Sequence, residues 1–402
     1  MSSNVIVKSR VNFFSFVRVY FVSLLSLYKD KGRTRLKFKG VFERVSSRID
    51  YQARTVQLNR IQSVDVVKLI AITGVIVIHA APFSEMSAER CIYRQLEIIL
   101  NQLSRFAVPF FFIISGYFFG IKERDDKRKI ISNTVVTVKR LFLIFFAWNV
   151  IYILPYNAGA IYEYGLSGPF KVAYWNLINL ASDPIRLIFH GTKAHLWFLA
   201  GLIWAVLFTG LFRYWGLYRS AFIIATGLYL AGLLAHSYSD SPFGIHFNFD
   251  IRNHIFFSTI FFITGYQLAY FKPRPSWFPT GIAVLALGVA IHSTEIYVLW
   301  MLYGTDPDMH SYTIGTYVMG IGTAAIALSN NRLLNIEAFA KMGRYVLGIY
   351  VVHYIFVDIL SPVSQMISSP FWEIVKVIVI LLLSAVVAVL LSKNKYTKKI
   401  IQ

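Results

Sequence analysis

Residues 65–81 read DVVKLIAITGVIVIHAA, an apolar run that is long enough to decide the fold. A helix needs ~17–25 such residues to cross ~30 Å of hydrocarbon. Comparable runs recur along the chain, so the sequence predicts an all-α membrane bundle of about ten transmembrane helices. The further runs cover residues 103–121, 135–156, 196–212, 220–236, 254–271, 279–300, 312–329, 345–361 and 373–392.

The composition excludes several other classes of protein. Hydrophobic residues make up 56% of the 402 residues and charged residues only 15%, which rules out a disordered chain, a fibrous protein and a soluble enzyme. The single cysteine, Cys91, excludes an internal disulfide and a cysteine-rich metal site. We expect no metal in the function of this chain.

The positive charge has a topological explanation. The chain carries 40 Lys and Arg against 20 Asp and Glu, a net charge of +20. If the N-terminus lies in the cytoplasm, most of the basic residues fall on that side, in residues 1–68, 122–140 and 393–402. Cytoplasmic loops of membrane proteins are enriched in Lys and Arg. We therefore predict cytoplasmic N- and C-termini and no nucleic-acid partner.

Three segments follow from these patterns: a basic extension over residues 1–60, a membrane domain over 61–392 and a basic cytoplasmic tail over 393–402. Within the extension, residues 11–28 are apolar but carry Arg18 near their centre. A central Arg costs ~2.5–3.5 kcal/mol on insertion scales. We therefore favour a helix that lies on anionic lipid at the cytoplasmic face; an eleventh span, with the N-terminus outside, is the alternative.

The first span carries ionisable groups on one face. Lys68 and His79 are eleven residues apart, which is three helical turns plus ~20°, and Asp65 lies within ~40° of His79. A face with three ionisable groups is expected to line a cavity or the bundle interior, because exposure to lipid is costly. The alternatives are that Lys68 reaches the cytoplasmic interface and that His79 caps the helix.

Within the second span, residues 105–120 read RFAVPFFFIISGYFFG. Pro109 cannot donate a backbone hydrogen bond, so we expect a bend there. Arg105 is a candidate for binding an anionic substrate group or a lipid phosphate, and Ser115 and Tyr117 offer hydroxyl groups deeper in the span. Ordinary helix packing is the alternative for this span.

Further candidates lie on later spans. Lys139 and Arg140 begin the third span, either as a cradle for phosphate groups or as a positive anchor. His195 begins the fourth span and is either a site residue or a solvated loop histidine. His353 lies near mid-depth in the ninth span, beside Tyr350 and Tyr354 on one helix face, where cavity lining and structural hydrogen bonding are both open.

Taken in order, these segments resemble the acyltransferase-3 family of integral membrane acyltransferases over residues 60–392. The resemblance rests on the DxxK-x10-H pattern of the first span, PFFFIISGYFFG at 109–120, the basic pair, HLWFL at 195–199, FFITGYQLA at 261–269 and LGIYVVHYIF at 347–356. It implies a ten-helix O-acyltransferase of the bacterial inner membrane that acts on cell-surface or lipid-linked carbohydrates. Acetyl-CoA is the implied donor. The family often has Arg at the position of Lys68.

On this basis we predict the roles of the site residues. His79 acts as the general base for the acceptor hydroxyl or carries the acyl group briefly. Phosphate groups of CoA are held by Lys68, Lys139 and Arg140. The acceptor or the reacting carbonyl is oriented by Arg105, Ser115, Tyr117, His195 and His353.

The acceptor and the reaction class stay open at this level. Candidate acceptors are lipopolysaccharide O-units, common-antigen repeats, capsules, exopolysaccharides and lipid-linked intermediates, and we expect the aromatic loop 157–195 to contribute to the choice. The main alternative function is a transporter or flippase for an envelope glycan precursor, because intramembrane ionisable groups also mark substrate paths. A non-catalytic membrane scaffold is a third interpretation.

Overall fold

The structure is a computed structural model, and it describes residues 61–86, 91–124, 129–153, 160–161, 164–246, 255–367 and 369–402. These residues form helices and connecting turns, with no β-strand among them. The predicted extension 1–60, including the interfacial segment 11–28, lies outside the described residues. Residues 61–402 form one compact unit.

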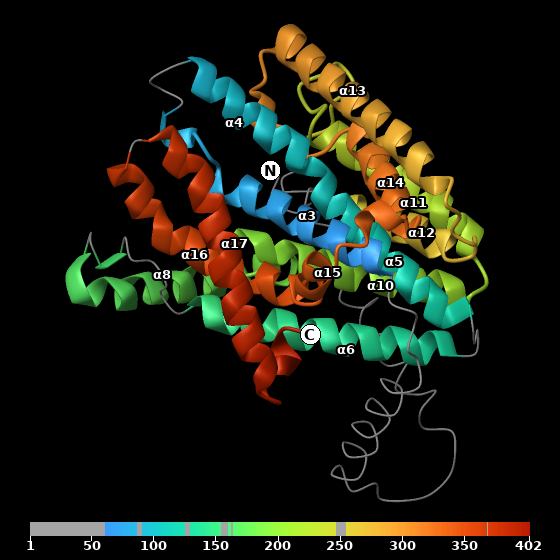
Figure 1. Ribbon diagram of the computed structural model, residues 1–402, viewed down its shortest axis with the longest axis horizontal. Helices are drawn as coiled ribbons and strands as arrows, with labels where there is room; N and C mark the ends of the chain where they lie inside the picture. The colour runs from blue at the N-terminus through green and yellow to red at the C-terminus, as the bar shows by residue number, and fades with distance from the viewer. Residues whose placement is uncertain are drawn as a thin grey trace, which may run out of the picture. The chain divides into compact units, whose positions relative to one another are not determined.

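The described residues of this unit include fourteen α-helices, and all but α9 are labelled in Figure 1. They are α3 (Gln62–Ala80), α4 (Cys91–Leu103), α5 (Ala107–Arg124), α6 (Ile130–Ile153), α8 (Gly168–Ser182), α9 (Pro184–Phe189), α10 (Trp197–Tyr214), α11 (Tyr218–Ala235), α12 (Ile255–Leu268), α13 (Trp277–Tyr303), α14 (Ile314–Leu328), α15 (Glu337–Gly343), α16 (Val346–Met366) and α17 (Pro370–Lys393).

The predicted all-helical membrane fold is confirmed. Eight helical stretches of the described chain are long and apolar enough to cross a membrane. The shorter apolar helices α12 and α14 coincide with the predicted sixth and eighth spans. The count of ten spans and the cytoplasmic placement of the termini stay predictions.

The second predicted span differs in detail. Its helix begins at Cys91 and runs through a short 3-10 turn, Ser104–Phe106, into α5. Pro109 therefore lies in the first turn of α5, where a backbone N–H has no partner within the helix in any case. The irregular backbone lies before the proline, and it carries Arg105.

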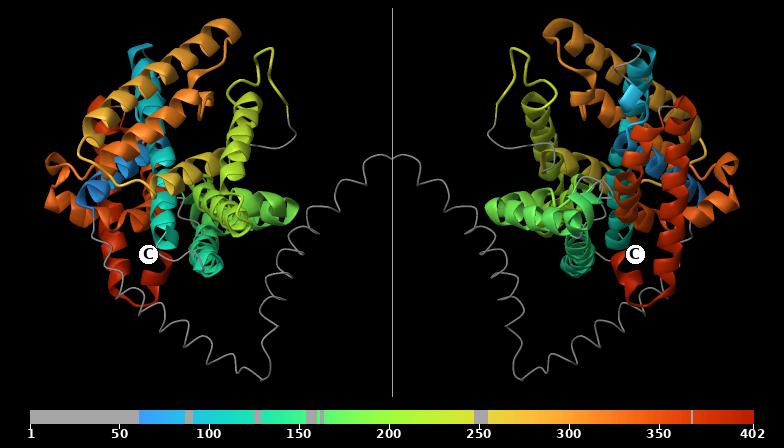
Figure 2. Two further views of the ribbon diagram at one scale, coloured as in Figure 1. Left: turned by 90° about the vertical axis from the view of Figure 1, so that its right-hand side faces the viewer. Right: turned by 90° about the vertical axis from the view of Figure 1, so that its left-hand side faces the viewer.

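Helix α3 lies at the centre of the unit, where it packs against α5, α14, α15, α16 and α17. Its side chains Ile72 and Ile76 are fully buried. The pairs α13–α14 and α16–α17 lie side by side in every view (Figures 1 and 2). A central position for α3 means that its polar side chains face other helices.

Helices α5 and α12 approach each other through glycine. A methyl group added at Gly116 would lie 1.9 Å from the carbonyl oxygen of Phe262, and one added at Gly265 would lie 1.8 Å from that of Ile113. No side chain fits at either position, so the two backbones pack directly. This contact fixes α5 beside the core of the bundle.

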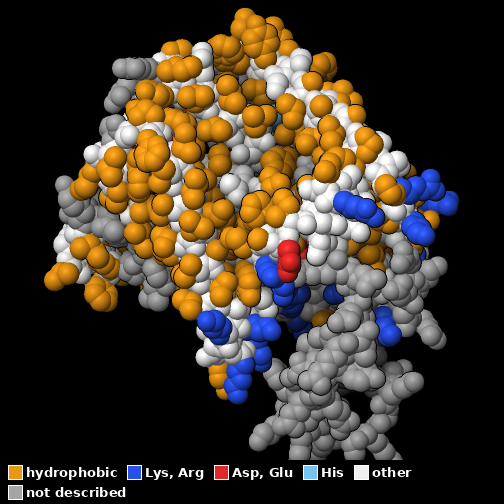
Figure 3. Space-filling model, viewed as in Figure 1, with side chains coloured by type: hydrophobic (Ala, Val, Ile, Leu, Met, Phe, Trp, Pro, Cys, Tyr) orange, Lys and Arg blue, Asp and Glu red, His pale blue; other side chains and the backbone are white. Residues whose placement is uncertain are grey.

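Side-chain types are segregated on the surface. On the face shown in Figure 3, hydrophobic side chains cover most of the helices, and Lys and Arg gather along the lower and right-hand borders. Large apolar side chains of α6, α13 and α17, such as Phe142, Trp300 and Leu382, are more than half exposed. An exposed apolar belt of this kind suits contact with lipid.

Candidate active site

Helix α3 sets the spacing of the predicted central residues. It is one uninterrupted helix from Gln62 to Ala80, so Lys68 and His79 lie ~16 Å apart along its axis. His79 occupies the last turn, and Asp65 and Lys68 occupy the first two turns. The two ends of α3 therefore present two different kinds of site.

Three imidazole rings converge at the His79 end of α3. His79 lies 5.4 Å from His353 of α16 and 6.3 Å from His195, measured between ring centroids. His195 belongs to the 3-10 turn Ala194–Leu196 before α10, and its ring lies 5.1 Å from that of His353. We call His79, His195 and His353 the histidine cluster. The structure thus brings together three of the predicted site residues from distant parts of the chain.

Tyrosine rings surround the histidine cluster. Tyr354 stacks on His195 at 5.0 Å with an interplanar angle of 14°, and lies 5.2 Å from His79. Tyr152 of α6 contacts His195 edge-on at 5.0 Å, and its hydroxyl donates to the carbonyl of Val351 at 2.7 Å. The role of Tyr152 was missed by the sequence analysis, because its helix offers no polar periodicity that would mark it.

Hydrogen bonds define one tautomer in the cluster. The Nδ1 atom of His353 lies 2.5 Å from the carbonyl oxygen of Tyr350, so Nδ1 must carry the proton. The hydroxyl of Tyr350 in turn donates to the carbonyl of His195. A neutral His353 then has its lone pair on Nε2, and this buried atom has no hydrogen-bond partner among the described residues.

His195 is buried as deeply as His353, with 1% of its surface exposed. Its two ring nitrogens make no hydrogen bond of normal geometry with a described residue. Buried polar atoms in native proteins nearly always have partners, so those left over call for a functional explanation. The unpartnered ring nitrogens of His195 and His353 make the histidine cluster a candidate binding site. Within the described residues, no group of three His, Cys, Asp or Glu side chains is arranged to hold a metal ion.

An ion pair lies beside the cluster. Lys193 and Asp358 are joined at 2.6 Å, and the ammonium group of Lys193 lies 5.0 Å from the ring centroid of Tyr354. Both charged side chains are partly buried. The pair connects the segment that carries His195 to helix α16, and so helps to hold two members of the cluster together.

The chain leaves α3 directly after His79 in an unusual conformation. Ala81 and Phe83 both have positive φ angles, of 41° and 72°. The N–H of Phe83 donates to the carboxylate of Glu373 at 2.6 Å, and Lys376 donates to the same oxygen at 2.5 Å. Glu373 and Lys376 are both buried. This contact offsets the backbone strain and fixes the last turn of α3, which holds His79.

At the other end of α3, Lys68 is not isolated. It lies 3.3 Å from Asp65, and its ammonium group is 5.3 Å from the ring centroid of Phe118 on α5. One quarter of the Lys68 side chain stays exposed. The predicted phosphate ligand is thus paired within its own helix but still accessible.

The predicted basic pair lies on α6. Lys139 and Arg140 are both exposed, and Arg140 is within electrostatic range of Lys122, one turn beyond Phe118 on α5. Like charges held near one another repel, and a bound polyanion relieves that repulsion. We call Lys68, Lys122, Lys139 and Arg140 the cationic group. Lys122 was not among the predicted site residues, although its basic loop was noted.

The candidate residues of the second span do not all lie near the histidine cluster. Arg105 lies within electrostatic range of His292 and His310, a polar group other than the histidine cluster. His292 is held by Gln102 at 3.0 Å and by Thr313 at 2.8 Å.

The charge of Arg105 affects His310, which lies in the loop between α13 and α14. Burial lowers the pKa of His310 in this loop, and the charge of Arg105 lowers it further against the raising effect of Asp240 and Asp306. Arg105 therefore favours the neutral form of a histidine in this loop.

Ser115 and Tyr117 lie between the two ends. Ser115 is half-buried, and Tyr117 is buried with its ring 5.5 Å from that of Phe118, the ring that Lys68 faces. Tyr117 is thus placed at the level of the cationic group. The two hydroxyls lie along α5 toward the Lys68 end.

A buried carboxylate was also missed. Glu123, at the end of α5, accepts hydrogen bonds from Tyr266, Tyr270 and Arg213 of neighbouring segments. The network ties α5, α10 and α12 together next to Lys122, and it fixes the end of the helix that carries the cationic group.

Comparisons with curated proteins give three relatives that are named racemases. Two proteins of Enterococcus faecalis named amino-acid racemase are each 31% identical to the chain, over 216 and 181 residues. The serine/alanine racemase of Enterococcus gallinarum is 26% identical over 257 residues. The matches cover 50%, 44% and 59% of this chain, respectively, but only 27%, 23% and 33% of those relatives. The chain thus spans no more than a third of the length of the curated relatives it matches. No solved structure matches the chain.

The family comparison covers much more of the chain. The model of the acyltransferase-3 family, described as an acyltransferase domain, matches residues 61–393. This range holds the histidine cluster, the cationic group and every apolar helix described above. The resemblance seen in the sequence motifs is thereby confirmed, and the chain belongs to the acyltransferase-3 family of membrane acyltransferases.

Proposed function

We propose that this membrane acyltransferase moves an acetyl group from acetyl-CoA to a hydroxyl of a cell-surface or lipid-linked carbohydrate, with His79 as the central catalytic residue. The observation that carries the proposal is the convergence of His79, His195 and His353 in an aromatic shell, with a buried Nε2 atom of His353 left for an outside partner. The setting that fits this function is the plasma membrane of a bacterium.

The chemical step needs a base and an acceptor hydroxyl. His79 takes the proton of the hydroxyl while its oxygen attacks the thioester carbonyl. A C–O bond forms, the C–S bond breaks, and the CoA thiolate leaves and takes up a proton. In the alternative route, an imidazole nitrogen of His79 forms the bond to the acyl carbon first and passes it to the hydroxyl.

The other cluster members support this step. The Nδ1–H of His353 is engaged by the Tyr350 carbonyl, so its Nε2 can accept a hydrogen bond and orient the acceptor or a neighbouring N–H. His195 is held against Tyr354 and offers its ring nitrogens in the same buried region. Hydrogen bonds in a water-poor site are electrostatically stronger than in water, which favours charge development during transfer.

The donor is held at the other end of α3. Lys122, Lys139 and Arg140 together with Lys68 present positive charge for the phosphate groups of CoA. The ~16 Å between Lys68 and His79 is a distance that the pantetheine arm is able to bridge. A bound donor therefore connects the cationic group to the histidine cluster.

The racemase names of the relatives do not change this proposal. They belong to proteins of which the chain matches a third or less, whereas the acyltransferase family covers residues 61–393.

Acetyl-CoA added to inverted membrane vesicles tests the proposal. We expect release of free thiol together with an acetylated envelope glycan, detected by mass spectrometry. The variant His79→Ala should lower both signals by ~10²–10⁴-fold. The matched control is His246→Ala, because His246 is exposed outside the cluster. Undiminished acetylation in the inserted His79→Ala protein would contradict the role of His79, and transport without thiol release would indicate a transporter.

A further inference from the structure

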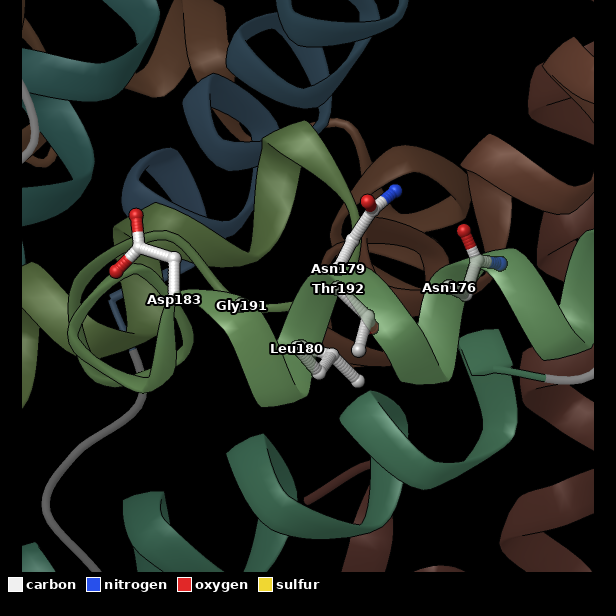
Figure 4. Close-up of a pocket in the computed structure, with 6 residues that line it drawn as sticks. All are labelled: Asn176, Asn179, Leu180, Asp183, Gly191 and Thr192. Atoms are coloured by element: carbon white, nitrogen blue, oxygen red, sulfur yellow. The ribbon is translucent and has the colours of Figure 1, made fainter.

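A polar pocket lies next to the segment that carries His195. It has a volume of about 100 Å³ and is lined by Asn176, Asn179, Leu180, Asp183, Gly191 and Thr192 (Figure 4). We propose that this pocket binds a neutral sugar ring of the acceptor through its hydroxyl groups. The inference rests on the proposed function, because it assigns a place to the acceptor of that reaction.

One face of α8 builds one wall of the pocket. Asn176 and Asn179 are spaced at i and i+3, so they lie on the same side of the helix, and Asp183 follows its last residue as the C-cap. Figure 4 shows both amide groups on one side of α8, with the Asp183 carboxylate at its end. The wall thus presents two amide side chains on α8 and one carboxylate at the end of the helix.

The opposite wall is the turn at Gly191 and Thr192, which is hydrogen-bonded to α6. Gly191 has a φ angle of +74°, and a methyl group there would lie 2.8 Å from Asn149 Oδ1. The N–H of Thr192 donates to this same oxygen at 2.6 Å, and the Thr192 hydroxyl donates to the Asn149 carbonyl at 3.2 Å. These two hydrogen bonds hold the wall against α6, and the positive φ angle of Gly191 suits glycine.

The lining indicates the chemical class of the ligand. Amide groups donate and accept, a carboxylate accepts, and the Thr192 hydroxyl, which donates to Asn149, is left as an acceptor; this set matches sugar hydroxyls, which both donate and accept. The lining contains one carboxylate and no cationic side chain, which disfavours an anionic ligand. A volume of about 100 Å³ equals that of ~3 waters, so it fits the edge of one ring and not a whole glycan.

An aromatic side chain lies beside the polar wall. Trp175 lies one turn before Asn179 on α8, and 60% of its surface is exposed. An exposed aromatic face provides apolar contact area next to polar groups, which suits the C–H faces of sugar rings.

The pocket is connected to the histidine cluster by the backbone. Thr192 and His195 are three residues apart, so their Cα atoms lie within ~11 Å of each other. Helix α6 also serves both sites, because it supplies Asn149 to the turn and Tyr152 to the ring of His195. A short oligosaccharide held in the pocket can therefore extend a hydroxyl toward the cluster.

Binding of simple sugars to the purified chain in lipid nanodiscs tests the inference. The probes are the methyl glycosides of glucose, galactose and N-acetylglucosamine, followed by saturation-transfer NMR and tryptophan fluorescence. We expect at least one to bind, and Asn179→Ala and Asp183→Asn each to weaken its binding by about three- to tenfold, the effect of losing one hydrogen bond. Ser182→Ala on the same helix should bind as the unaltered chain does.

The test separates this inference from the proposed function. His79→Ala should keep sugar binding while losing acetyl transfer, so that a failure of catalysis leaves the pocket result intact. Equal affinity in the Asn179→Ala, Asp183→Asn and Ser182→Ala variants would overturn the proposal. So would the absence of binding by all three glycosides, or binding of L-serine or Ca²⁺ in their place with the same dependence on Asp183.

Discussion

The rings of His79 and His353 lie 5.4 Å apart, with their planes tilted by 38°, although one belongs to α3 and the other to α16. The His353 ring is oriented by the Tyr350 carbonyl, which accepts from its Nδ1 atom. His353 can therefore act on His79 or on the acceptor only through Nε2. A substitution that tests His353 must therefore remove Nε2 and keep the donor at Nδ1.

Replacing His353 by Asn keeps a donor near the Nδ1 position but removes the Nε2 acceptor. We expect kcat for acetyl transfer to fall by ~10²-fold, with little change in KM for acetyl-CoA, because the donor site lies at the other end of α3. Steady-state kinetics in vesicles measures both constants. His246→Asn is the control, and a His353→Asn enzyme of unchanged kcat would remove His353 from the reaction.

Lys68 provides a second test. We expect Lys68→Ala to raise KM for acetyl-CoA by about tenfold, because it removes a cation from the phosphate site, and Lys68→Arg to keep most of the affinity. The Asp65 carboxylate at 3.3 Å can hold either cation in place. If the Arg variant lost activity while its donor affinity stayed intact, the phosphate role of Lys68 would be wrong.

Arg140 is expected to act on phosphate through charge. Arg140→Gln and Lys122→Gln should each raise KM for acetyl-CoA several-fold at low salt, and the difference should shrink as the ionic strength rises. With acetyl-dephospho-CoA, which lacks one phosphate, the two substitutions should raise KM by a smaller factor if that phosphate is the one bound. Lys395→Gln, an exposed residue of the C-terminal tail, serves as the control. Salt-independent kinetics would argue against the cationic group.

The buried pair of Glu373 and Lys376 predicts a change in stability. Glu373→Gln leaves the Lys376 ammonium buried without its carboxylate, and we expect the free energy of unfolding to fall by ~3 kcal/mol. Adding Lys376→Met should restore most of it, because the uncompensated charge is gone. Denaturant titration of the purified chain measures both variants.

The exposed pair of Glu337 and Lys341 gives the matched control for this change. Glu337→Gln should leave the unfolding transition where it is, since exposed ion pairs contribute little. A Glu373→Gln variant as stable as the unaltered chain would show that the buried pair does not hold the turn after His79.

Much of the fold could be predicted because it is local. The apolar runs gave the all-helical membrane class, and the helices lie within a few residues of the predicted spans, as with 135–156 against Ile130–Ile153. The Lys68–His79 spacing follows from helix geometry alone. The start of the second helical stretch at Cys91 was missed, because residues 91–102 mix polar and apolar side chains and are less apolar than a typical span.

The site was predicted only in part, because its contacts join distant segments. His195 and His353 were candidates with open alternatives, and only packing places them against His79. The acceptor role of Arg105 stays a prediction, and only packing places its charge near His292 and His310. Glu373 carries no signal in the sequence that links it to Phe83.

The sequence by itself determined that this chain forms membrane helices and that His79 and Lys68 share a face of one of them, since both properties depend on residues close together in the chain. The tertiary structure decided which helices meet and in which rotation. Lipid-facing and core-facing sides of such helices are both apolar, so hydrophobic periodicity does not specify their neighbours. Close contacts such as Gly116 on Phe262 and hydrogen bonds such as that from the Phe83 N–H to Glu373 specify them instead, and these exist only once the helices are packed.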